Sequence, residues 1–449
     1  MSHSSTSFTL TLDDVEVQAF PGETLWQVAK RAGETIPHLC FKDAPGYRAD
    51  GNCRACMVEV EGERVLAASC IREAAPNMVV RSTGSSRVKA ARKGVLELLL
   101  ADQPERENSP DRSSHLWDTA DQLAIDVGAV RQRIPAHSER NEPTVHHVEP
   151  RSDSLAHASG HDASHSAMNV NLDACITCGL CERACREVQG NDVIGLAHRG
   201  AASKVVFDFD DPMGDSTCVA CGECVQACPT GALMPATLID ARGRGDSATA
   251  DRKVDSVCPY CGVGCQLTYH VKDGPTPAGS EKGEHRGRIL FVEGKDGPSN
   301  QGRLCVKGRF GFDYPSHPAR LTRPLIRREG VPKGLDPNFD PANPLTHFRE
   351  ASWEEALDLA ANGLTQLKTQ HGPAALAGFG SAKCSNEEAW LFQKLVDGVP
   401  GLRRRHCFVH AGASVRCGHP HRLQPGREPS GGCHLFQTGR QKRHQAHNH

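Results

Sequence analysis

The chain of 449 residues carries 52 basic and 54 acidic residues, so its charge is nearly balanced and gives no reason to expect nucleic acid or an anionic membrane as its partner. At this length about three domains are expected, and the low hydrophobic content of 38% indicates that their cores are local. No stretch of about 18 apolar residues occurs and the first residues do not form a secretory signal, so we expect no membrane insertion. The twenty cysteines, many of them in Cys-x2-Cys groups, then indicate metal sites with reduced thiols in the cytoplasm rather than disulfides.

The N-terminal residues 1–84 are predicted to form a small domain around four cysteines. Residues 7–20 alternate apolar and polar side chains, which predicts a β-hairpin, and Thr24 is placed to cap a short helix that ends near Gly33. The cysteines that follow are spaced C-x12-C-x2-C-x13-C, with Gly46 and Gly51 in the loop where a backbone must wrap closely around a cluster: Cys40, Cys53, Cys56 and Cys70. This arrangement favours a [2Fe–2S] centre in a β-grasp fold, and a zinc ribbon is the alternative.

Residues 85–168 are predicted to form a helix followed by a polar linker. Residues 86–101 begin basic and end apolar, as expected of a helix that packs on the first domain. From about residue 103 to 168 the chain is polar and has no cysteine, so its histidines are interpreted as solvated linker residues rather than metal ligands: His137, His146, His147, His157, His161 and His165.

Two cysteine runs define the next domain, residues 169–240. Each has the spacing C-x2-C-x2-C-x3-C, and the second ends in Pro229. This pattern is typical of two [4Fe–4S] clusters, in which the fourth cysteine of each run binds the other cluster. The expected ligand sets are Cys175, Cys178, Cys181 and Cys228 for one cluster, and Cys218, Cys221, Cys224 and Cys185 for the other. Two zinc knuckles are the alternative. Residues 205–209 between the runs predict a strand, residues 210–214 a turn, and residues 240–251 a hinge.

A fourth cysteine group follows, with the spacing C-x2-C-x3-C-x39-C: Cys258, Cys261, Cys265 and Cys305. Zinc could accept this spacing, but it would not explain the glycines around the cysteines or Lys307, two residues after the last of them.

The residues from Cys305 onward carry a family resemblance. The stretch Cys-Val-Lys-Gly-Arg-Phe-Gly-Phe-Asp-Tyr, then Pro-Ala-Arg-Leu-Thr-Arg-Pro-Leu-Ile from residue 318, is similar to the opening of molybdenum or tungsten bis-pterin oxidoreductases. Residues 352–357 and 378–389 extend the likeness. Within that superfamily the chain most resembles the α subunit of cytoplasmic NAD-dependent formate dehydrogenases. Its N-terminal domain also resembles the large subunit of respiratory NADH dehydrogenases.

The resemblance implies an α+β multidomain protein. Its parts would be a β-grasp [2Fe–2S] domain, a ferredoxin-like domain with two [4Fe–4S] clusters, a [4Fe–4S] domain at 252–312, and at 313–396 the N-terminal part of a molybdopterin oxidoreductase α/β domain. It implies that the fourth cysteine group holds a third [4Fe–4S] cluster beside a molybdenum or tungsten bis-pterin guanine dinucleotide. Lys307 would lie between this cluster and the pterin as an electron relay, and a surface lysine is the alternative. The implied activity is oxidation of formate to CO2, with electrons passing to a flavin subunit that reduces NAD+. The implied partners are this flavin- and NAD-binding subunit and a small iron–sulfur subunit. Larger relatives carry a further histidine-ligated cluster after the first domain, but this sequence lacks its cysteines.

Residues 397–449 change in character, because they are rich in Arg, His, Gly and Pro without helical or strand periodicity. Relatives carry the cysteine or selenocysteine that binds the pterin metal near this point, whereas the flanks of Cys407 and Cys417 do not match. We interpret the tail as a frameshift with truncation, and a basic tail or a histidine-rich metal-binding tail as the alternatives. The catalytic residues therefore stay unnamed, and we expect this chain not to oxidise formate. The rival functions are the large subunit of an NADH dehydrogenase and an iron–sulfur protein that only relays electrons.

Overall fold

The computed structural model describes residues 7–134, 161–274 and 287–397, apart from Pro318, Leu335, Asp336, Asn338, Phe379 and Ala382. The chain divides into two compact units, residues 1–322 and 323–449, which are described separately. All four cysteine groups lie in the first unit.

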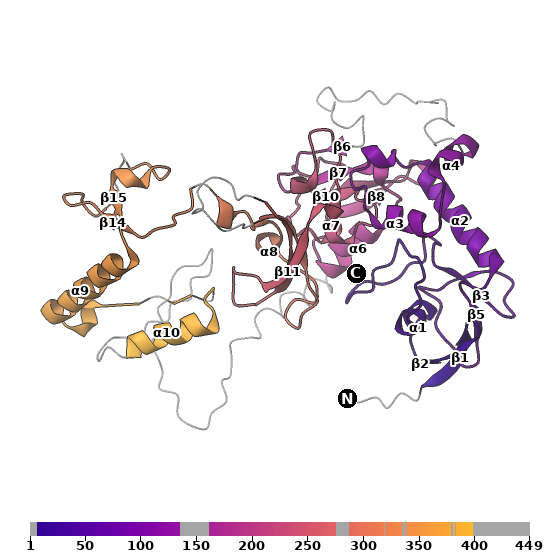
Figure 1. Cartoon of the computed structure of the whole chain (residues 1–449), viewed down its shortest axis with the longest axis horizontal. Helices are drawn as coiled ribbons and strands as arrows, with labels where there is room; N and C mark the ends of the chain where they lie inside the picture. Colours follow the sequence, from indigo (N-terminus) through magenta and orange to yellow (C-terminus); the bar gives the residue numbers. More distant parts are fainter. Residues whose placement is uncertain are drawn as a thin grey trace, which may run out of the picture. The chain divides into compact units, whose positions relative to one another are not determined.

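The N-terminal domain (residues 7–81) is a five-stranded sheet with one short helix against it (Figure 1). The strand order is β2-β1-β5-β3-β4, where β1 (Phe8–Leu12) pairs antiparallel with β2 (Val15–Ala19) and parallel with β5 (Val79–Arg81). Strands β3 (Met57–Val60) and β4 (Ala67–Ala68) complete it. Helix α1 (Leu25–Arg31) begins at the expected Thr24, whose hydroxyl accepts from the Gln27 amide. The hairpin and the helix predicted from the sequence are both present.

The prediction of a polar linker from residue 103 onward is wrong for residues 103–134. After α2 (Ser86–Ala101) the chain forms η1 (Arg106–Asn108), α3 (His115–Gln122) and α4 (Val127–Arg133). Leu116 and Trp117 of α3 are buried in one apolar cluster with Leu96 and Leu100 of α2. The few apolar residues of this segment fall on one side of α3, so a polar average composition hides a local core.

Two of the six histidines assigned to the linker also lie in folded structure. His161 belongs to β6 (His161–Asp162), where its Nε2 lies 3.1 Å from Asn169 Nδ2, and His165 Nδ1 accepts from the Ala167 amide at 3.1 Å. The other four (His137, His146, His147 and His157) lie outside the described residues.

The central domain (residues 161–238) carries the two cysteine runs. Its sheet has the order β10-β7-β6, with β7 (Met168–Asn171) and β10 (Leu233–Pro235), and a hairpin of β8 (Ile194–Ala197) and β9 (Lys204–Phe207) lies beside it. Each run begins in a loop and continues into a short helix: the first into α6 (Leu180–Arg183) and the π-helical turn η4 (Ala184–Val188), the second into α7 (Glu223–Ala227). Strand β9 ends at Phe207 rather than Phe209, because Asp208 turns the chain with a φ of +48° and Phe209 is 98% exposed.

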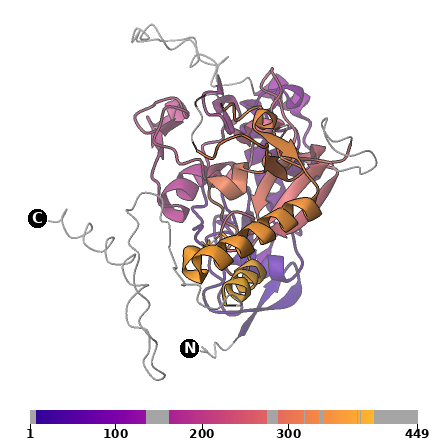
Figure 2. The same cartoon turned by 90° about the vertical axis from the view of Figure 1, so that its left-hand side faces the viewer.

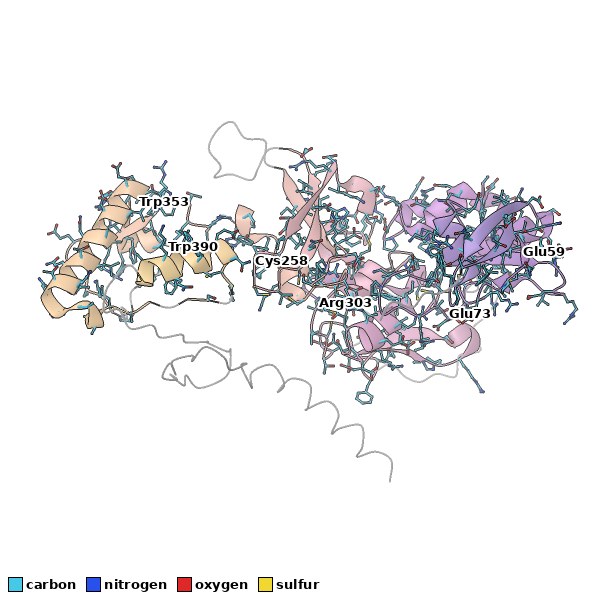
Figure 3. The ribbon with its side chains drawn as sticks, turned by 90° about the horizontal axis from the view of Figure 1, so that it is seen from below. Glu59, Glu73, Cys258, Arg303, Trp353 and Trp390 are labelled. Atoms are coloured by element: carbon cyan, nitrogen blue, oxygen red, sulfur yellow. The ribbon has the colours of Figure 1, made fainter. Side chains whose placement is uncertain are left out.

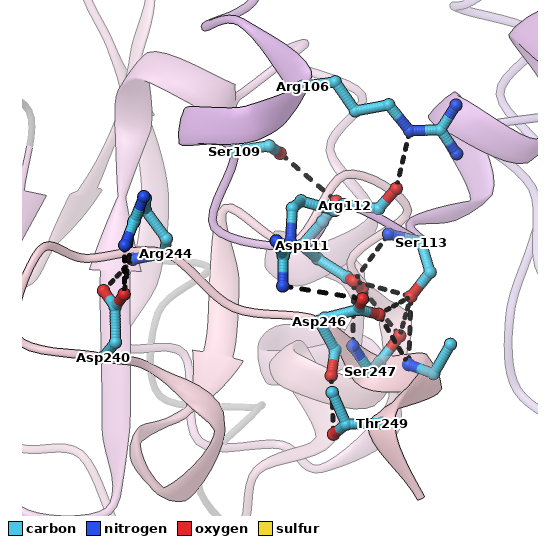
Figure 4. Close-up of polar contacts among 11 residues, drawn as sticks. Arg106, Ser109, Asp111, Arg112, Ser113, Asp240, Arg244, Asp246, Ser247 and Thr249 are labelled. Carbon is cyan, nitrogen blue, oxygen red and sulfur yellow. Dashed lines mark hydrogen bonds and ion pairs between the residues drawn. The ribbon is translucent and has the colours of Figure 1, made fainter.

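The expected hinge at 240–251 is instead a segment held by hydrogen bonds (Figure 4). The buried Asp111 carboxylate accepts from the amide and hydroxyl of Ser247, at 3.0 and 2.9 Å, and from the hydroxyl of Ser113 at 3.0 Å. Asp240 closes a turn by accepting from the Arg244 amide and guanidinium. The Gly, Ser and Asp residues that suggest flexibility in the sequence serve here as turn formers and hydrogen-bond partners.

The third domain (residues 252–312) is an antiparallel sheet with one short helix. Strands β11 (Arg252–Val257), β12 (Gln266–Lys272) and β13 (Arg288–Gly294) pair in sequence order. Helix α8 (Val306–Phe310) follows Cys305, which is its N-cap residue, and contacts β13. Short 3-10 turns join or end these domains: η3 (Leu172–Ala174), η5 (Gly200–Ala202), η6 (Ala236–Leu238), η7 (Ser247–Thr249) and η8 (Tyr314–Ser316).

The second unit has two strands, β14 (Leu325–Arg327) and β15 (Phe348–Glu350), and two longer helices, α9 (Trp353–His371) and α10 (Asn386–Asp397), with the turns η9 (Pro344–Thr346) and η10 (Pro373–Ala375). Helix α9, the longest of the unit, is seen well in Figure 2, and it has no buried residue. Trp353 and Trp390, labelled in Figure 3, are 69% and 59% exposed. The described part of this unit therefore has almost no core of its own. Across the described residues, no helix combines the length and apolar character needed to span a bilayer.

Candidate metal-cluster sites

In the first group, site A (Cys40, Cys53, Cys56 and Cys70), the first three cysteines lie in the loops between α1 and β3, and the fourth lies in the turn after β4. The thiol of Cys40 is hydrogen-bonded to Cys53, and this contact, against the opposing effect of burial, lowers the pKa of Cys53 to about 6. Cys70 acts in the same way on Cys56, whose pKa falls to about 7. The four sulfurs thus form two close pairs. Two irons with two cysteines each use such an arrangement, and four cysteines are the usual ligand set of a [2Fe–2S] cluster.

The two runs exchange their fourth cysteines. One cavity is lined by site B (Cys175, Cys178, Cys181 and Cys228) and another by site C (Cys218, Cys221, Cys224 and Cys185). Each cavity therefore combines three thiols from one run with the last thiol of the other. Cys185 lies in the π-helical turn η4, a wider turn of a kind that is frequent at functional sites.

The other walls of these two cavities are mainly apolar. Leu172, Val205 and Leu233 line the cavity of site B, and Val193, Phe207 and Met213 line that of site C. Burial raises the pKa of Cys175 to about 11 and raises the pKa of Cys181 and Cys224 well above the ordinary value. Thiols in such surroundings become thiolates when they bind a metal. The donor set and its apolar enclosure fit a cluster in each cavity.

Site D (Cys258, Cys261, Cys265 and Cys305) lies in the third domain, where Figure 3 labels Cys258. The Cys258 amide donates to the Cys265 carbonyl oxygen at 2.8 Å. Burial raises the pKa of Cys258, neighbouring Cys305 and Cys261 act in the same direction, and the ammonium group of Lys307 opposes them. The structure thus brings the four cysteines and Lys307 together. A Cβ at Gly308 would lie only 3.4 Å from the sulfur of Cys258, so the start of α8 is close to this sulfur.

Zinc is the alternative occupant of these cysteine groups. Within the described ranges, no three Cys, His, Asp or Glu side chains converge as needed to hold a single metal ion. A tetrahedral zinc with Zn–S bonds of about 2.3 Å needs its thiolates to meet closely around one point. At sites B and C the four thiols line a cavity, which leaves room for a multi-iron cluster.

The four sites follow one another through packed side chains. Cys40 of site A and Cys178 of site B belong to one cluster of buried residues, and Cys181 of site B and Cys224 of site C belong to another. Phe310 of α8 packs against this second cluster, so the helix that begins at Cys305 of site D reaches site C.

Two buried arginines, which sequence reasoning missed, lie at these junctions. Arg183 donates to the Cys40 carbonyl oxygen at 2.7 Å, lies near that of Cys178 and pairs with Asp50, so it joins sites A and B. Arg309 donates to the Cys221 carbonyl oxygen at 3.2 Å and joins sites C and D. The sequence offers only a weak signal for either residue, namely its place close after a cluster cysteine.

Comparisons with known proteins agree with this division of the chain. Four family models match: the 2Fe-2S iron-sulfur cluster binding domain at residues 5–85, the 4Fe-4S dicluster domain at 174–232, the molybdopterin oxidoreductase Fe4S4 domain at 251–317 and molybdopterin oxidoreductase at 320–414. The chain therefore carries regions that match iron–sulfur domains and the molybdopterin oxidoreductase family in sequence. The last match runs past the boundary that the sequence pattern placed at residue 396 and includes Cys407.

Three individual proteins are similar to most of this chain. The chain is 31% identical to the probable oxidoreductase YjgC of Bacillus subtilis over 91% of its own length and 40% of that protein. It is 26% identical to a putative formate dehydrogenase of Staphylococcus aureus (90% and 39%) and 32% identical to a chain of the NADH-quinone oxidoreductase of Rhizobium meliloti (86% and 38%). The chain is thus similar both to a putative formate dehydrogenase and to a subunit of an NADH-quinone oxidoreductase. It spans about 40% of the length of these relatives.

Proposed function

We propose that this chain is the iron–sulfur and molybdopterin subunit of a formate dehydrogenase that passes its electrons to NAD+. Site A would hold a [2Fe–2S] cluster, and sites B, C and D would each hold a [4Fe–4S] cluster. When bound, the molybdenum or tungsten bis-pterin guanine dinucleotide would supply the two-electron oxidation of formate to CO2. A flavin- and NAD-binding subunit and a small iron–sulfur subunit are the proposed partners.

The continuous series of sites D, C, B and A carries this proposal. Formate and NAD+ each change by two electrons, whereas iron–sulfur centres change by one, so a series of such centres with a flavin at its end suits the exchange. Sites A and B share packed residues, as do sites B and C, and Phe310 of the helix that begins at Cys305 packs against site C. Each site has its own four cysteines. The cysteines hold the clusters, the apolar walls keep water from them, and α8 keeps site D against site C.

Lys307 is proposed to hold its ammonium group between site D and the pterin. Its side chain is exposed, as the surface-lysine alternative also requires, and its charge acts on the sulfur of Cys258, which supports a place close to the cluster. An ammonium there can donate hydrogen bonds to the pterin and stabilise negative charge during electron transfer.

Two assays test the relay and the substrate separately. NADH, added with the flavin-binding partner under anaerobic conditions, should reduce the clusters and produce their EPR signals. Formate-dependent reduction of a viologen dye tests the formate chemistry. Clusters that NADH cannot reduce would overturn the relay. Formate-dependent dye reduction would support formate as the substrate, whereas cluster reduction without it agrees with our expectation that this chain does not oxidise formate.

The second candidate is the large subunit of an NADH dehydrogenase, favoured by the 32% identity to the NADH-quinone oxidoreductase chain of Rhizobium meliloti. Both candidates need the four clusters, but only the formate enzyme needs pterin. Release of a fluorescent pterin from the denatured protein would favour formate dehydrogenase, and its absence would favour the rival.

A further inference from the structure

A buried ion pair lies directly beside site C. The side chains of Arg309 and Glu223 are each only 3% exposed, and Arg309 Nη2 lies 3.2 Å from Glu223 Oε2. The other donors of Arg309 face the Cys221 carbonyl oxygen (3.2 Å), the Val292 carbonyl oxygen (3.3 Å) and the side-chain oxygen of Gln226. The guanidinium is therefore fixed in one place, with a cluster ligand as one of its partners.

Glu223 is the opposing charge in the same place. It lies in sequence between the site C cysteines Cys221 and Cys224, and its second oxygen accepts from the Tyr47 hydroxyl at 2.8 Å and lies 3.5 Å from the ammonium of Lys42. A buried ion pair loses hydration when it forms and is weak evidence for stability, since an apolar pair of similar volume often serves as well. A buried pair that contacts the backbone of a cluster ligand points to an electrostatic role.

The packing places Arg309 in close contact with the turn of site C. Gly222 has a φ of +68°, and a Cβ there would meet Arg309 Cγ and Phe310 Cζ at 2.8 Å. Helix α8 therefore presses Arg309 against the turn that carries Cys221. The same helix begins at Cys305 of site D.

We propose that Arg309 raises the reduction potential of the cluster at site C, and that Glu223 limits this effect. The inference rests on the proposed function only in taking site C to hold a [4Fe–4S] cluster. Reduction adds one electron to the cluster, so a fixed positive charge beside it stabilises the reduced state and a negative charge destabilises it. Because the surroundings are buried, solvent screens these charges weakly. Arg309 is a positioning and tuning residue, since it contacts the backbone of a ligand and not the substrate.

Variants with opposite charge changes test the proposal in the full chain, reconstituted with iron and sulfide. Potentials of the individual clusters are measured by redox titration followed by EPR. Arg309→Gln should shift the potential of the site C cluster to more negative values and Glu223→Gln to more positive ones. Arg309→Lys, which keeps the charge, should keep most of the wild-type potential.

Arg92 provides a matched control. It is also a buried arginine that donates to a backbone oxygen next to a cluster ligand, that of Met57 after Cys56, at 2.9 Å. Arg92→Gln should shift the cluster of site A and leave that of site C unchanged. If Arg309 has a purely structural role, Arg309→Gln and Glu223→Gln should shift the potential of the site C cluster in the same direction or not at all. Either result would overturn the proposal.

The failure of this inference differs from the failure of the proposed function. A wild-type protein without a [4Fe–4S] signal from site C would overturn the proposed function. Signals from all four clusters, with unchanged potentials in the Arg309 and Glu223 variants, would overturn only the tuning role. If Arg309→Gln loses its cluster, Glu223→Gln and Arg309→Lys still decide, because both keep a side chain that fills the site.

Discussion

Gly222→Ala should destabilise the chain by separating α8 from the turn of site C. An alanine at its φ of +68° enters the left-handed region, which costs about 1–2 kcal/mol. Its Cβ would also stand 2.8 Å from Arg309 Cγ and Phe310 Cζ, and overpacking of this kind costs about 1–3 kcal/mol. The expected loss in the free energy of unfolding is the sum, about 2–5 kcal/mol. It is measured on the reconstituted protein by anaerobic urea titration, followed by loss of cluster absorbance.

Gly62→Ala is the control, because Gly62 also has a positive φ, +85°, but nothing lies within 4 Å of the added Cβ. This variant should lose only the backbone part, about 1–2 kcal/mol. Equal losses in the two variants would contradict the reasoning, since they would mean that α8 does not press on Gly222.

Two further predictions concern the N-terminal part of the chain. Leu116→Ala should lower the free energy of unfolding by about 2–5 kcal/mol, because Leu116 is fully buried against α2. Leu98→Ala, on the exposed side of α2, should change it by less than about 0.5 kcal/mol. Equal effects of the two variants in a urea titration would mean that residues 103–134 do not pack against α2. Burial acts to raise the pKa of Asp13, but hydrogen bonds from the Thr83, Gly84 and Ser82 amides outweigh it and hold the pKa below its ordinary value of 3.8. The ionised carboxylate therefore stabilises the fold at pH values above 3.8, and this stabilisation is lost as the pH falls through the lower pKa of the folded state. Asp13→Asn should remove this acid-dependent part from the pH profile of the urea midpoint.

The cysteine groups could be predicted from the sequence because ligand spacing is local chemistry. The spacing C-x2-C-x2-C-x3-C places three thiols on one turn of backbone, and this grouping needs no knowledge of the rest of the fold. The structure brings Cys185 and Cys228 across to the opposite runs, as that pattern predicts. The hairpin and the Thr24 cap are equally local features, and both are present.

Features that depend on distant contacts could not be predicted in this way. Arg309 and Glu223 are 86 residues apart, and neither carries a signal of its partner. Helix α3 lies in a stretch whose composition predicts a linker, because its buried face has few residues within a polar segment. Residues 240–251 look flexible by composition, but their partner Asp111 lies more than a hundred residues away in the chain.

Iron analysis with EPR on the anaerobically purified chain tests the central claim most directly. One [2Fe–2S] and three [4Fe–4S] clusters predict about fourteen irons per chain, two plus three times four. Cys185→Ser should then alter the signal of the cluster held by Cys218, Cys221 and Cys224, and leave that of Cys175, Cys178 and Cys181 unchanged. Stoichiometric zinc with little iron, or a change confined to the cluster of the Cys175 run, would contradict the account.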